Sequence, residues 1–317
     1  MKKFISISIS LGLIFTLIFG YLYRQQVKDF VVANYSTQQV EAIDLSEKLD
    51  LTNKGDQLYK SSKPEILSST EFNNSCQTVQ KEKSIVLGCY TKQRLYIYKV
   101  DDSRLDGVEE VTAAHELLHA VYERMSKSDK QELDKELILA ADSITDPHFV
   151  QLVAEYRKTE PTELNNEIHS ILGTEIAVLP TSLENHYAKY FKDRQKIVAY
   201  SNNYQDVFKK NTNQIEVFDK QLAELKKQID SLDSQLKMLE PQLTLKQREL
   251  ARLRSADVDA YNLQVPIFNS LVNQYNSLVN DAKKLTDQYN TVVVNRNSVA
   301  QNQDDLSKKL DSNYQTK

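Results

Sequence analysis

A long heptad repeat of apolar residues is the feature that most limits how this 317-residue chain can fold. The repeat runs from residue 215 to residue 253 in steps of three and four, with one lapse at Lys246. Its members are Ile215, Phe218, Leu222, Leu225, Ile229, Leu232, Leu236, Leu239, Leu243, Leu250 and Leu253. This spacing places them on one stripe of an α-helix about 58 Å long, which is typical of a coiled coil.

A second, softer apolar seam follows an interruption over residues 255–266. It runs through Phe268, Leu271, Tyr275, Leu278, Ala282, Leu285, Tyr289, Val292, Val299 and Leu306. Two seams of similar length joined by a short break predict an antiparallel helical hairpin, with a parallel homodimer or another coiled-coil partner as the alternative. Pro241 falls on the outer face of this register, where it should bend the helix without entering the seam.

The rest of the chain predicts a small α+β domain within a mainly α protein. Six glycines and six prolines are few for this length, which favours extensive helix. Alternating apolar residues predict a β-hairpin with strands near residues 84–90 and 94–100. Helical patterns follow near 108–125, 128–143, 147–158, 163–172 and 180–200. We therefore expect a membrane-proximal segment at 24–75, the domain at 76–200 and the coiled coil at 201–317.

The predicted helix from Val108 to Met125 carries the sequence His115-Glu116-Leu117-Leu118-His119. Histidines four residues apart leave one face of a helix about one turn apart, close enough to share a metal ion. Glu116 could then take a proton from a water on that metal while staying outside the ligand set. All five histidines of the chain lie between residues 115 and 186, which indicates one functional region.

This segment resembles the zincin metallopeptidases over roughly residues 84–192, although only the His115–His119 helix matches strongly. The elongated metzincin signature needs Gly and His soon after His119, and residues 120–125 contain neither. The resemblance is therefore closer to the gluzincins, which take a third zinc ligand from a glutamate on a later helix, often in an Asn-Glu pair. It implies that His115, His119 and Glu167 bind Zn²⁺, with Glu175 as the main rival to Glu167.

The match departs from the gluzincins four residues after Glu167, where Ile171 replaces the usual acid. Ser170 or Thr174 could take over by hydrogen-bonding a ligand. His169 could itself be the third ligand.

Peptidases of this kind also place a Tyr or His donor near the developing oxyanion. The resemblance makes Tyr187 and His169 the first candidates for that catalytic role, with His186 and Tyr190 beside them.

The N-terminal sequence predicts a membrane anchor. Residues Phe4 to Tyr23 carry no charge, and twenty helical residues span about 30 Å, the thickness of a bilayer core. Lys2 and Lys3 precede them, which favours an uncleaved anchor over residues 1–23 with the bulk of the chain outside the cytoplasm. A cleaved signal peptide is the alternative. We expect a single-pass protein of a bacterial cell membrane.

The two cysteines of the chain, Cys76 and Cys89, suit that compartment and predict a disulfide, with two reduced thiols as the alternative.

The net charge is −4 and no basic stripe occurs, so we expect no nucleic-acid partner.

Three functions are compatible with these patterns. The first is a membrane-tethered zinc peptidase acting on a peptide or protein substrate. The second is an envelope-anchored coiled-coil interaction protein, in which a non-catalytic zinc only stabilises the domain. The third is hydrolysis of cell-wall peptides or amides, with the coiled coil positioning the domain.

Overall fold

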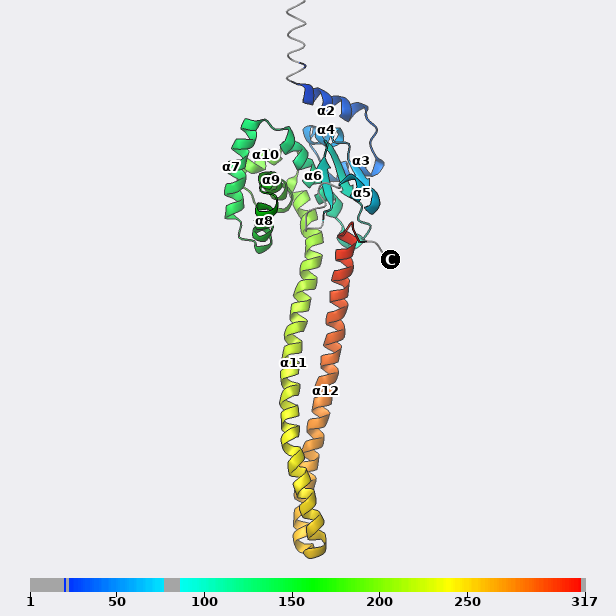
Figure 1. Cartoon of the computed structure of the whole chain (residues 1–317), viewed down its shortest axis with the longest axis vertical. Helices are drawn as coiled ribbons and strands as arrows, with labels where there is room; N and C mark the ends of the chain where they lie inside the picture. The colour runs from blue at the N-terminus through cyan, green and yellow to red at the C-terminus, as the bar shows by residue number, and fades with distance from the viewer. Residues whose placement is uncertain (1–19, 21–22, 77–85, 315–317) are drawn as a thin grey trace, which may run out of the picture. The chain divides into compact units, whose positions relative to one another are not determined.

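The computed structural model describes residues 20, 23–76 and 86–314 and is mainly helical, with one small β-sheet (Figure 1). The chain divides into two compact units. The first consists of residues up to Val207 together with those from Leu306 onward, and the second is Phe208–Asp305. The predicted combination of a small α+β part with a long helical hairpin is confirmed.

The first unit begins with short helices and the sheet. In chain order these elements are α2 (Arg24–Tyr35), α3 (Val40–Leu49), α4 (Asn53–Ser61), β1 (Glu65–Leu67), α5 (Ser69–Ser75), β2 (Gly88–Thr91), β3 (Arg94–Tyr98) and the 3₁₀ helix η1 (Ser103–Leu105). Five helices follow: α6 (Val108–Arg124), α7 (Lys127–Ser143), α8 (Pro147–Thr159), α9 (Leu164–Glu175) and α10 (Thr181–Tyr187).

The sheet has the strand order β1-β3-β2, so β2 is an edge strand. β3 pairs antiparallel with β2, with Cys89 opposite Tyr96, and parallel with β1. The predicted hairpin is confirmed, with strands shorter than expected; residues 84 and 85 lie outside the described part of the chain. Lys92 and Gln93 have φ of 51° and 60°, the left-handed conformation of a tight hairpin turn. The three-residue β1 was not predicted, because it is too short to show alternation.

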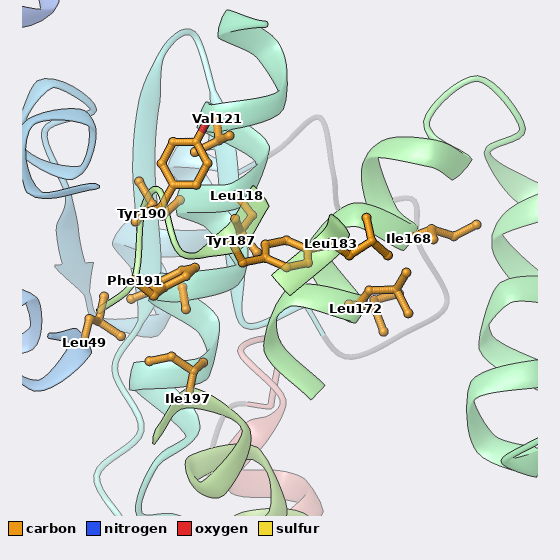
Figure 2. Close-up of a cluster of buried hydrophobic side chains, with 14 of the residues drawn as sticks. Leu49, Leu118, Val121, Ile168, Leu172, Leu183, Tyr187, Tyr190, Phe191 and Ile197 are labelled. Atoms are coloured by element: carbon orange, nitrogen blue, oxygen red, sulfur yellow. The ribbon is translucent and has the colours of Figure 1, made fainter. Parts of the chain in front are cut away.

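The core is built on the contact between α6 and α9. Leu117 and Leu118 of α6 are fully buried, as is Leu172 of α9. Gly173 allows this close approach, because a Cβ there would lie 2.3 Å from Leu118 Cδ1. Figure 2 shows part of this core, with Tyr187 between Leu118 and Ile168 in that view.

Residues 24–75, predicted as a membrane-proximal segment, pack on the domain. Leu45, Leu49 and Tyr59 belong to the same hydrophobic core as α6, and both α3 and α4 contact that helix. The predicted helix over 180–200 is also interrupted, between Tyr187 and Arg194. There the chain bonds back to residues 50–52: Thr52 N donates to the carbonyl of Tyr190 at 2.9 Å. That long-range pairing leaves no local sequence pattern.

The predicted disulfide is confirmed. Cys76 and Cys89 are bonded, with their Cα atoms 6.0 Å apart, and both are buried against Phe72. The bond ties the end of α5 to the edge strand β2.

The second unit is the paired part of α11 (Arg194–Ala256) and α12 (Val258–Leu310). The two helices run antiparallel: Arg296 Nε donates to Asp219 Oδ1 at 2.8 Å across 77 residues of sequence. Pro241 is exposed, as predicted. The predicted interruption over 255–266 was wrong in extent, since only Asp257 separates the helices. Its carboxylate accepts from the amide of Ala260 at 3.0 Å and so caps α12.

Among the described residues, no helix is both long and apolar enough to cross a bilayer. Of the anchor predicted over residues 4–23, only Gly20 and Tyr23 belong to the described part of the chain.

The α6–α9 contact predicts the effect of Gly173→Ala. The added methyl would also lie 2.7 Å from Tyr187 Cε1, so the two helices must move apart. We expect the free energy of unfolding to fall by about 1–3 kcal/mol, measured by chemical denaturation. Gly20→Ala is the control, because a Cβ there meets no atom within 4 Å. Unchanged stability of Gly173→Ala would contradict this description of the core.

Candidate metal centre and its cavity

Helix α6 positions the two histidines of the HELLH sequence. It begins after Gly107, whose φ of +97° turns the chain into the helix, and Glu109 and Glu110 lie in its first turn, where they complement the helix dipole. The ring centroids of His115 and His119 are 4.8 Å apart. The ligand-type atoms of His115, Glu116 and His119 all lie within 4.8 Å of one another, so these three could hold a metal ion.

Glu167 of α9 faces both imidazoles. One carboxylate oxygen lies 3.6 Å from His115 Nε2 and the other 3.5 Å from His119 Nε2. These distances exceed the roughly 2.7–2.9 Å of a direct charge-assisted hydrogen bond. They match the spacing of about 3.3–3.5 Å between two donors on one tetrahedral zinc, since each bond would be about 2.0–2.2 Å long. The carboxylate therefore lies within reach of a cation shared with the two imidazoles, beside the group that His115, Glu116 and His119 form.

The carboxylate of Glu167 is held in its charged form. Burial acts to raise its pKa, but the imidazoles of His119 and His115 and a hydrogen bond from Tyr156 outweigh burial and lower the pKa to about 2. A carboxylate in this state is ready to bind a cation.

The hydrogen bonds of His119 leave its Nε2 free to act as a ligand. Nδ1 lies 3.0 Å from Asn166 Oδ1, and the Asn166 amide donates from its nitrogen to Glu163 Oε2 at 3.4 Å. With Asn166 Oδ1 as its acceptor, Nδ1 carries a proton, so loss of the other ring proton would leave the Nε2 lone pair toward Glu167, as metal binding requires. Ser170 Oγ is also 3.3 Å from Nδ1, the role expected for it in place of an acid. Thr174 bonds instead to the backbone carbonyl of Ser170.

Glu116 lies on the side of α6 that faces the edge strand. Its side chain is buried beside Gly88 of β2, where an added Cβ would lie 2.6 Å from Oε1. A side chain at position 88 would therefore displace the carboxylate. Glu116 thus lies beside both histidines and against Gly88 of β2.

These groups share a cavity of about 420 Å³. Its walls include residues 86–90 before and within β2, both histidines of α6, and Tyr156 of α8. Among the described residues that line it are five glutamates, Glu116, Glu160, Glu163, Glu167 and Glu175, and no lysine or arginine. This described part of the wall is therefore electronegative.

The candidate oxyanion donors do not line this cavity. Tyr187 is fully buried and donates to the backbone carbonyl of His169 at 2.7 Å, so it is a core residue. His169 is also fully buried, and its Nε2 lies 2.9 Å from that of His186. Burial lowers the pKa of His169 well below its usual value and that of His186 to about 4, so the two form a neutral pair. Tyr190 packs beside His186.

Two further residues line the cavity, one of which the sequence had suggested and one of which it had not. Glu175, the rival ligand, lines the cavity but accepts a hydrogen bond from Gln205 at 3.1 Å. Tyr156 was not selected from the sequence, and nothing in its surroundings on α8 distinguishes it there. Its hydroxyl reaches Glu167 within the cavity.

No protein-family model matches the chain, and no curated protein or solved structure matches it. The likeness to gluzincins rests on the residues described above.

The contacts of His119 predict a role for Asn166 in metal binding. Asn166→Ala removes the acceptor that fixes the imidazole, so zinc affinity should fall about 10–100-fold. Titration with a zinc-competing chelator measures this. Asn165→Ala is the matched control, because that neighbouring residue does not line the cavity. Equal zinc affinities in the two variants would show that Asn166 does not position His119.

Proposed function

We propose that this protein is a zinc-dependent peptidase, tethered to a membrane with its catalytic domain outside the cytoplasm. The observation that carries the proposal is the Glu167 carboxylate, which offers one oxygen to each imidazole of a His-Glu-x-x-His helix at 3.5–3.6 Å. Two histidines and one carboxylate form the ligand set of several zinc hydrolases.

His115, His119 and Glu167 would hold the zinc. When bound, zinc would supply a Lewis acid that acidifies water and polarises a peptide carbonyl. Asn166 and Ser170 keep the His119 ring in the tautomer that binding requires.

Glu116 would act as the general base. Its carboxylate is close to the ligand atoms of both histidines and is kept in place by β2 at Gly88. It would accept a proton from the attacking water and hold it at a carboxylate oxygen for transfer to the leaving amine.

The edge strand β2 would bind the substrate backbone. It is the last strand of the sheet among the described strands, and residues 86–90 line the cavity. An extended peptide can pair with such an edge through main-chain hydrogen bonds. Because Gly88 has no side chain, the backbone of β2 can lie against Glu116 without a steric clash.

Tyr156 is the donor that we assign to the developing oxyanion, in place of Tyr187 and His169. It is half-buried, lines the cavity and already hydrogen-bonds Glu167. The five glutamates among the described lining residues favour peptides with neutral or basic side chains near the scissile bond.

The second candidate function is a coiled-coil interaction protein with a non-catalytic domain that a structural zinc stabilises. The antiparallel pairing of α11 and α12, which have 63 and 53 residues, favours it. It shares the metal site with the peptidase proposal and differs only in predicting no cleavage.

The variant Glu116→Gln distinguishes the two functions. In the peptidase, this change removes the base and leaves the three ligands, so kcat should fall about 10²–10⁴-fold while zinc content stays unchanged. The measurement is cleavage of a mixed peptide library by the full chain, with zinc assayed in parallel. Glu132→Gln, at an exposed carboxylate of α7, is the control. Full activity in Glu116→Gln would refute the proposed mechanism, and zinc without any cleavage in the wild type would favour the interaction protein.

A further inference from the structure

Helix α2 exposes apolar side chains along one face. Val27, Phe30 and Val31 are each about half exposed, at 52%, 54% and 48%, and Tyr35 is 81% exposed. Residues at these spacings lie on one side of a helix. Such a face on a short surface helix indicates an interaction site, because scattered exposed residues would not align.

The opposite side of α2 attaches the helix to the domain through polar side chains. Asp29 is buried there and accepts hydrogen bonds from Arg124 Nε at 2.9 Å and Arg124 Nη2 at 3.0 Å. Gln25 also donates to Asp29, at 3.0 Å. A surface helix of a soluble protein normally turns its apolar residues inward, whereas α2 leaves Val27, Phe30, Val31 and Tyr35 exposed. Figure 1 shows α2 beside α4, with which it makes many contacts.

The outward charge of α2 is positive. Asp29 is its only acidic residue and points inward, whereas Arg24 and Lys28 are exposed. A partner for this face should therefore combine an apolar interior with a neutral or anionic surface, which a lipid bilayer does.

The position of α2 in the chain selects the bilayer over other apolar partners. The helix begins at Arg24, directly after the uncharged stretch Phe4 to Tyr23, which is long enough to cross a bilayer core. A helix that starts where such a segment ends begins at the level of the lipid headgroups. Tyr35 and Phe30 add the aromatic side chains that favour this interface.

We propose that α2 lies in the bilayer interface, with Val27, Phe30, Val31 and Tyr35 among the lipids and Asp29 facing the domain. Arg124 is the last residue of α6, the helix that carries His115 and His119. The bond from Asp29 to Arg124 therefore connects the membrane-bound helix directly to the end of the metal-binding helix. This inference concerns the surface of the domain and stands whether or not the protein is a peptidase.

The chain contains no tryptophan, so a single introduced one reports its surroundings without background. We would place the full chain in phosphatidylcholine–phosphatidylglycerol vesicles, with and without bromine on the acyl chains. The reporter is Phe30→Trp, and the control is Leu139→Trp, at a 71% exposed position on α7. We expect blue-shifted emission that brominated lipid quenches for Phe30→Trp, and neither effect for Leu139→Trp. Val27→Trp gives a second reading if Phe30→Trp disturbs folding.

Two results would overturn the proposal. Blue-shifted emission without quenching would mean that protein covers the face, either residues 1–19 or a second copy of the chain. Emission at the wavelength of exposed tryptophan, without quenching, would mean that the face remains in water.

Discussion

The close packing of α9 on α6 is the contact on which the candidate site depends. His115 and His119 lie together because of helix geometry alone, but a histidine pair is not a zinc site. The proposed third donor, Glu167, comes from a different helix, and it lies beside the imidazoles because Gly173 lets the two helices approach at Leu118. The same α9 carries Glu167, Asn166 and Ser170, so one helix–helix contact supplies the third donor and both hydrogen-bonding partners of His119.

Those partners are neutral, which distinguishes this site from one with a carboxylate behind the ligand. An amide oxygen and a hydroxyl can fix the ring of His119 without adding a negative charge beside it. Five glutamates already lie among the described residues that line the cavity, and a further buried carboxylate would add to their mutual repulsion. Ile171, which stands where the acid would be, is instead buried in the core.

The sequence predicts the local features of this protein well and the long-range ones poorly. The heptad spacing from Ile215 to Leu253 repeats often enough to identify the helical hairpin, and the His115–His119 spacing is a local property of one helix. Glu167 could be selected only through resemblance to a family. Tyr187 and His169 lie in the core, which residue type alone does not reveal: one donates to a backbone carbonyl, and the other pairs with His186. The sequence did not indicate the role of Tyr156 or the presence of β1, since each depends on contacts with residues distant in the sequence.

The most direct test of the account is the zinc content of the purified full chain and of two variants, Glu167→Ala and Glu175→Ala, by elemental analysis. The wild type and Glu175→Ala should each bind one zinc per chain, and Glu167→Ala should lose it while keeping its helical content. Zinc retained in Glu167→Ala but lost in Glu175→Ala would identify Glu175, and not Glu167, as the third ligand. A folded wild type that binds no zinc would contradict the metal centre altogether.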